Sequence, residues 1–123
     1  MPKGILHIYH IDSPYPSIAF TKASTGEVWL NHRLAKGLPK EHIVFILLHE
    51  EGHIVLDTRN ELEADNYAFK KYADAGYSLT QSVYALSKIL NGTNPEHYWR
   101  CYYQLQRAIS YDYYNNGNKN LKL

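Results

Sequence analysis

The sequence predicts an α+β fold in which a small antiparallel β-sheet packs on a helical bundle. Two observations support this prediction. The first 31 residues contain short segments in which apolar and polar residues alternate, whereas the segments after residue 39 are longer and follow helical spacing. The length of 123 residues fits one domain, and no repeat or linker divides the chain, so we expect a single domain over residues 1–123.

Three N-terminal segments are predicted strands. Residues 4–11 alternate loosely and end at a turn that contains two prolines. Residues 17–23 and 27–31 also alternate, and the short segment Ser24-Thr25-Gly26 separates them. Two alternating segments joined by about three residues with a glycine are typical of a β-hairpin.

Four later segments are predicted helices. Residues 40–56 are apolar on most sides, which is typical of a helix buried in the centre of a domain. A short polar link follows, so we expect the next helix, residues 61–75 with Gly76 after its end, to return antiparallel beside the first. Two more helices are expected over residues 80–90, ending at Asn91-Gly92, and over residues 95–114, with Asn94 as the N-cap.

Composition and charge exclude several classes of protein. Apolar residues make up 45% of the chain and charged residues 20%, which is ordinary for a globular protein and not for a disordered one. The formal net charge of +1 predicts no nucleic-acid partner and no anionic membrane surface. No apolar segment approaches the roughly 20 residues that span a bilayer, and no signal peptide is visible, so we expect a cytoplasmic protein. Residues 115–123 are rich in Asn and Lys and are expected to form a flexible tail.

The segment His49-Glu50-Glu51-Gly52-His53 fits the pattern HExxH. Residues four apart lie on one face of a helix, so both imidazoles can reach one metal ion. Glu50 lies about 100° around the helix from His49, beside such an ion, where a general base for its water belongs. The alternative is that the histidines are hydrogen-bonded core residues and Glu50 a surface carboxylate. Because the pattern is expected only about 0.02 times by chance and lies in the most apolar helix, we favour the metal site.

Catalytic zinc usually has three protein ligands, so a third ligand is expected. The first turn of the returning helix lies level with His53 and contains Glu61. Glu61 and Asp65 share one helical stripe, whereas Glu63 points about 200° away from Glu61. We therefore predict Glu61 as the third ligand and Asp65 as the hydrogen-bond acceptor that fixes the tautomer of a ligand histidine.

Two capping arrangements bear on this choice. A capping box from Thr58 to Glu61 would occupy Glu61, whereas Asn60 as N-cap with Glu63 leaves Glu61 free for a metal. The second arrangement is consistent with the metal site, and Glu63 stays the alternative ligand. Asp57 would lie about 6 Å past His53 along a continuous helix, so we expect it to be a turn or capping residue.

His49-Glu50-x-x-His53 followed by Glu61-x-x-Ala64-Asp65 resembles the gluzincin branch of zincin metallopeptidases, in particular minigluzincins and the ImmA-type peptidases of mobile elements. The resemblance covers about residues 18–72, with a shorter connection between His53 and Glu61 than these families usually have. It implies a small sheet over the HExxH helix, a glutamate ligand from a second helix, and an edge strand that aligns an extended peptide. Residues 17–31 are the candidate for that strand.

These residues predict a zinc-dependent metallopeptidase that cleaves a protein or peptide substrate. Zn²⁺ held by His49, His53 and Glu61 would activate water, and Glu50 would move its proton to the leaving nitrogen. The alternatives are a non-catalytic or regulatory metal-binding protein of a phage or mobile element, and a purely structural ion. The sequence does not choose among the residues that can stabilise the oxyanion: Arg59, Tyr72, Tyr98, Arg100 and Tyr102.

Overall fold

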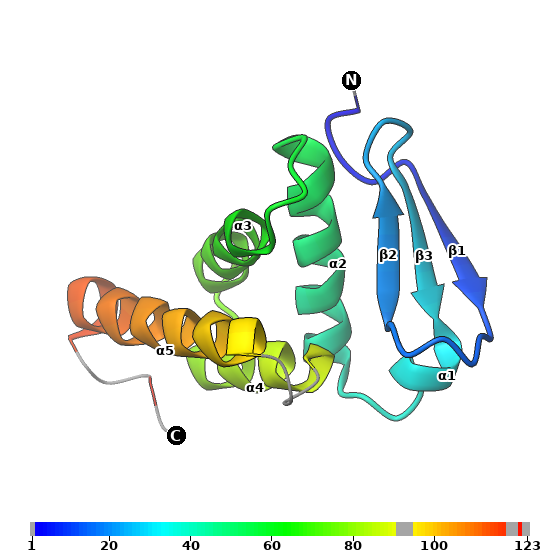
Figure 1. Ribbon diagram of the computed structural model, residues 1–123. Coiled ribbons are helices and arrows are strands. Elements are labelled where there is room, and N and C mark those ends of the chain that lie inside the picture. Colours follow the sequence, from blue (N-terminus) through cyan, green and yellow to red (C-terminus); the bar gives the residue numbers. More distant parts are fainter. Residues whose placement is uncertain (1, 91–94, 118–120, 122–123) are drawn as a thin grey trace.

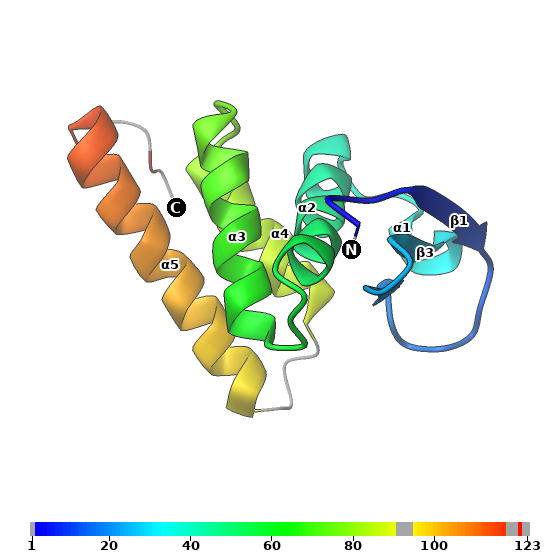
Figure 2. The ribbon, with the colours of Figure 1, turned by 90° about the horizontal axis from the view of Figure 1, so that it is seen from above.

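A computed structural model describes residues 2–90, 95–117 and 121, and it confirms the α+β fold (Figure 1). Three strands are followed by five helices in this part of the chain: β1 (His7–Ile11), β2 (Ala19–Lys22), β3 (Glu27–Asn31), α1 (His32–Ala35), α2 (Lys40–Val55), α3 (Glu61–Asp74), α4 (Leu79–Ile89) and α5 (Pro95–Asn116). The helix α2 lies between the sheet and the other long helices, as both views show (Figures 1 and 2). Within the described residues, no helix has the length and apolar character needed to cross a membrane.

The sheet is mixed and not purely antiparallel, so the prediction was wrong in this respect. The hairpin of β2 and β3 is present and antiparallel, with Ala19 opposite Leu30 and Lys22 opposite Glu27. The third strand, β1, pairs with the other side of β3 in parallel, which gives the order β1-β3-β2. As a result β3 is the central strand, and β2 is an edge strand that faces α2 (Figure 1).

Asn31, at the end of β3, holds the segment that connects β1 to β2. Its side chain is fully buried, and its amide nitrogen donates to the carbonyl oxygens of Ser13, Tyr15 and Ser17 at 3.1–3.2 Å. Its side-chain oxygen accepts from the backbone N–H of Ser13 at 3.1 Å. One buried amide thus satisfies the backbone of the segment that crosses from β1 to β2 past the end of β3.

The helix α2 is buried on two sides, as its apolar sequence predicted. Phe45 belongs to the apolar cluster that α2 forms with the other long helices, and the next residue, Ile46, belongs to the cluster against the sheet. Neither side chain is more than 1% exposed. A helix that packs on opposite sides needs apolar residues around most of its circumference.

Gly52 lets α2 and α3 approach closely. A Cβ atom at this position would lie 3.1 Å from the Tyr67 ring and 3.2 Å from both the Cα atom and the carbonyl oxygen of Ala64. A larger residue would therefore push the two helices apart. The glycine inside the HExxH motif thus places the start of α3 beside the histidines.

The helices agree with the predicted ones to within a residue or two at most ends, with two larger differences. The short helix α1 was not predicted, because four residues carry no helical period. The helix α5 continues to Asn116, so the segment 115–123 that we predicted as a flexible tail begins with helical residues. Gly76 has a positive φ of 89° after the end of α3, as predicted for a C′ glycine. The predicted N-cap Asn94 and the predicted stop at Asn91-Gly92 lie outside the described residues.

Candidate metal centre

A cleft of about 950 Å³ is lined by residues of both β2 and α2. One wall is the chain segment from residue 15 to residue 24, which contains the whole of β2. The opposite wall contains His49, Glu50 and His53 from α2, together with Glu61 from α3 and Arg100 from α5. The sequence motif therefore opens onto a large cleft along the free edge of the sheet.

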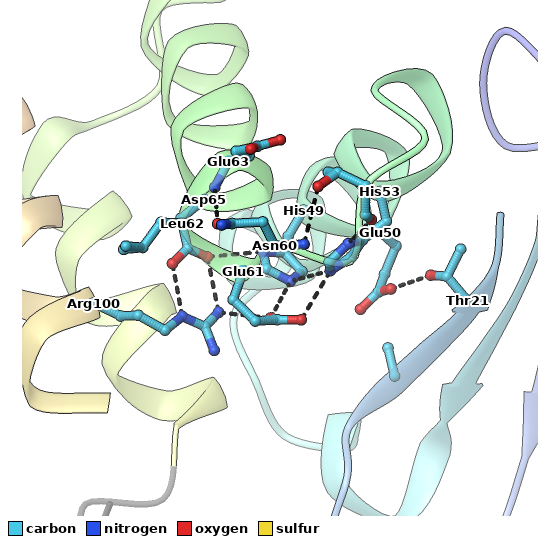
Figure 3. Close-up of polar contacts among 12 residues, drawn as sticks. Thr21, His49, Glu50, His53, Asn60, Glu61, Leu62, Glu63, Asp65 and Arg100 are labelled. Atoms are coloured by element: carbon cyan, nitrogen blue, oxygen red, sulfur yellow. Dashed lines mark hydrogen bonds and ion pairs between the residues drawn. The ribbon is translucent and has the colours of Figure 1, made fainter. Parts of the chain in front are cut away.

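The side chains of His49, His53 and Glu61 converge at this cleft (Figure 3). The two Nε2 atoms lie 3.1 Å apart. One carboxylate oxygen of Glu61 lies 3.1 Å from Nε2 of His49, and the other lies 3.2 Å from Nε2 of His53. Among the described residues, these three form the one group of His, Cys, Asp and Glu side chains with the geometry to hold a metal ion.

The other ring nitrogen of each histidine faces an acceptor of the protein. Nδ1 of His49 lies 2.8 Å from a carboxylate oxygen of Asp65, and Nδ1 of His53 lies 2.8 Å from the backbone carbonyl oxygen of Thr58. A carbonyl oxygen and an ionised carboxylate can only accept, so each Nδ1 carries the hydrogen. In the neutral imidazoles, both Nε2 lone pairs then point toward the carboxylate of Glu61.

Three electron-pair donors that face one another repel unless a positive charge, either a proton on an imidazole or a metal ion, lies between them. Tetrahedral zinc with bonds of about 2.0–2.2 Å holds its ligand atoms about 3.3 Å apart, which is close to the separations given above. A donor set of two imidazoles and one carboxylate is also that of a catalytic zinc site. The residues present therefore fit zinc, and the small number of protein donors leaves a coordination position for water or substrate.

The charges around the histidines favour a positive charge at this point. Burial lowers the pKa of His49, but hydrogen bonds to Asp65 and Glu61 and the charge of Glu50 outweigh burial and raise this pKa to about 9. The pKa of His53 is also raised, since Glu61 and the Thr58 carbonyl outweigh burial. Burial raises the pKa of Glu61, but the two histidines and Arg100 outweigh it and hold this pKa well below its usual range. A divalent cation is the natural occupant of such a pocket.

Glu50 lies beside this group and not within it (Figure 3). It is 7% exposed and lines the cleft, and its carboxylate accepts a hydrogen bond from the Thr21 hydroxyl on β2. Its neighbour Glu51 points elsewhere, to the Tyr67 hydroxyl at 2.8 Å and to Lys71 at 3.4 Å. Of the two adjacent glutamates, only Glu50 is placed to act on a molecule in the cleft.

The turn between α2 and α3 decides which glutamate meets the histidines. Asp57 has a positive φ of 48°, which reverses the chain at once, so Asp57 is the turn residue that we predicted. The side chain of Asn60 then caps α3 by accepting from the backbone N–H of Glu63 at 3.0 Å. This is the capping arrangement that leaves Glu61 free, and the structure brings Glu61 to the histidines while Glu63 stays exposed.

No protein-family model, curated protein or solved structure matches this chain. The resemblance to gluzincins therefore stays a prediction from the motif, and the function has to be inferred from the geometry of the cleft.

Two contacts of the centre were not predicted from the sequence. Arg100 was only one of five candidates for stabilising an oxyanion, and the structure places its guanidinium against Asp65 and Glu61. The carbonyl oxygen of Thr58 carries no signal in the sequence, because its direction depends on the backbone of the turn. Of the other four oxyanion candidates, Arg59 lines the cleft, Tyr72 is fully buried, and Tyr98 and Tyr102 are exposed on α5 and do not line it.

Proposed function

We propose that this protein is a zinc-dependent metallopeptidase that cleaves a protein or peptide substrate. One observation carries the proposal: two imidazole Nε2 atoms and a carboxylate converge on one point in an open cleft, with a separate carboxylate, Glu50, beside them. A purely structural zinc site is closed by four protein ligands and needs no such base. The alternative of a non-catalytic or regulatory metal-binding protein gives Glu50 no role.

The residues have distinct tasks in this reaction. His49, His53 and Glu61 hold the ion, which when bound lowers the pKa of water toward 7 and polarises a carbonyl group. Glu50 accepts the proton of the attacking water and delivers it to the leaving nitrogen. The Thr21 hydroxyl holds the Glu50 carboxylate from the opposite wall of the cleft.

The edge of β2 supports a peptide as the substrate. β2 pairs with β3 on one side only, and the cleft runs along its other side. An extended peptide can add to such an edge as a further strand, with main-chain hydrogen bonds that do not depend on its sequence. A peptide bound in this way would have a peptide bond next to Glu50. The near-neutral charge gives no reason to propose a nucleic-acid partner, and a cytoplasmic location stays a prediction from the sequence.

A comparison of Glu50→Gln and Glu51→Gln tests the proposal. Each of the two substitutions removes one carboxylate from the same turn of α2, but only Glu50 faces the cleft. We expect about one zinc per chain in the wild type and in both variants, measured by elemental analysis. Cleavage of a complex peptide mixture, followed by mass spectrometry, should be present in the wild type and Glu51→Gln and reduced at least about 100-fold in Glu50→Gln.

Two results would contradict the proposal. Cleavage by Glu50→Gln at the wild-type rate would show that Glu50 is not the general base. A wild type that binds zinc and cleaves no peptide in the mixture would favour a non-catalytic metal-binding protein.

A further inference from the structure

Arg100 comes to the candidate metal centre from α5, 35 residues after Asp65. It is 5% exposed. Its Nε lies 2.7 Å from one carboxylate oxygen of Asp65, and its Nη2 lies 2.9 Å from the other. This is the bidentate arrangement that the planar guanidinium of arginine makes with a carboxylate, and that lysine cannot make.

The same Nη2 atom lies 3.2 Å from a carboxylate oxygen of Glu61 (Figure 3). Asp65 and Glu61 both contact His49, Asp65 at Nδ1 and Glu61 at Nε2. The four side chains therefore form a closed ring: His49, Asp65, Arg100 and Glu61. Arg100 is the member of this ring that joins the two carboxylates on the side away from the histidine.

The charges show why an arginine is needed there. Asp65 is fully buried, and an ionised carboxylate is costly to bury without a partner. With zinc bound, the carboxylates of Glu50, Glu61 and Asp65 carry three negative charges, which the ion and Arg100 together balance. Without Arg100, the buried group would keep one uncompensated negative charge, and the half-exposed side chain of Glu61 would lose its link to α5.

We infer that Arg100 is a positioning residue of the metal centre. It keeps the Asp65 carboxylate beside Nδ1 of His49, and it holds Glu61 at the distance from Nε2 that an ion requires. The helix α5 is then part of the centre and not only a cover for α3. This inference depends on the zinc site proposed above, but not on the cleavage of a peptide.

The competing explanation is that the ion pair only anchors α5 to α3. Arg107 provides the control, because it also joins these helices and its charge also acts on Asp65, but its hydrogen bonds go to residues outside the ring. Its guanidinium donates to the Gln104 side chain at 3.0 Å on α5 and to the Leu62 carbonyl oxygen at 3.5 Å on α3. An anchoring role would make Arg100 and Arg107 alike in their effect on the metal.

The test compares Arg100→Lys, Arg100→Met and Arg107→Met in the full chain. The zinc dissociation constant is measured by competition with a chromophoric chelator, and the ligand field by the absorption spectrum of the cobalt-substituted protein. Loss of a residue that orients metal ligands weakens metal binding about 10- to 100-fold. We expect this loss and an altered cobalt spectrum for both Arg100 variants, whereas Arg107→Met should bind zinc within about twofold of the wild type and keep its spectrum.

Thermal unfolding of the zinc-free proteins separates folding from metal binding. If Arg100→Met does not fold, Arg100→Lys decides, because it keeps the charge and loses the bidentate geometry. Folded Arg100 variants that bind zinc as tightly as the wild type, with an unchanged cobalt spectrum, would overturn the inference and leave the zinc site standing. A wild type that binds no zinc would overturn both.

Discussion

Each histidine of the candidate centre has one ring nitrogen facing a group of the protein and the other free to bind the proposed ion. Nδ1 of His49 faces Asp65, and Nδ1 of His53 faces the Thr58 carbonyl oxygen. These contacts therefore set the orientation of both rings before a metal arrives, and a preorganised site loses little free energy in ordering its ligands.

Among single residues, the choice between two glutamates of α3 as the third metal ligand is the sharpest test of the proposed site. Glu61→Gln should lower zinc affinity at least about 100-fold, because the carboxylate that faces both Nε2 atoms becomes a neutral amide. Glu63→Gln should leave zinc affinity unchanged, since Glu63 is exposed and contributes its backbone N–H to the cap of α3. Isothermal titration of the zinc-free proteins measures both constants. The reverse pattern would exchange the proposed ligand.

Among the elements, the contact between α2 and α3 determines whether the ligands meet. These helices approach at Gly52, one residue before His53, and the tight turn after α2 brings the first residue of α3 level with the histidines. The distance between two helix axes thus sets the distance between the proposed metal ligands. The candidate metal centre consequently depends on a packing contact that contains none of these ligands.

Gly52→Ala tests this dependence. At an unconstrained helical position, the change from glycine to alanine stabilises a protein by about 0.5–1 kcal/mol. Here the new Cβ would lie 3.2 Å from the backbone of Ala64, which moves only if α3 moves. We expect the free energy of unfolding of the zinc-free protein to fall by about 1–3 kcal/mol in chemical denaturation, and zinc binding to weaken. An increase in stability would mean that the helices do not approach as described.

Across the whole molecule, features that depend on neighbouring residues could be predicted from the sequence. Features that depend on contacts between distant residues could not. The β2–β3 hairpin and the four long helices each have a short-range signal, and so does the Asn60 cap, which was one of two arrangements that the sequence allowed. The parallel pairing of β1 with β3 has no such signal, because the two strands are far apart in the sequence. The segment after β1 is held by the buried side-chain amide of Asn31, which is also distant in the sequence. Arg100 lacked a signal for the same reason, since nothing near it in the sequence indicates Asp65 as its partner.

Zinc should stabilise the folded chain as a whole. The proposed ion would bind ligands that come together only after folding, so its binding free energy would add to the stability of the folded state. Free zinc at about 100 times the dissociation constant adds about 2.7 kcal/mol, which for a domain of this size raises the Tm by roughly 10 °C over that in a chelator. Differential scanning calorimetry should show this shift for the wild type and not for Glu61→Gln. Equal Tm values for the wild type with zinc and with chelator would indicate that no such site forms.

A crystal structure of the zinc-loaded protein, with anomalous data at the zinc edge, tests the central claim most directly. We predict one anomalous peak about 2.0–2.2 Å from Nε2 of His49, Nε2 of His53 and a carboxylate oxygen of Glu61, with a water molecule in the remaining position on the side of Glu50. A peak elsewhere, or a fourth protein ligand in place of the water, would contradict the account.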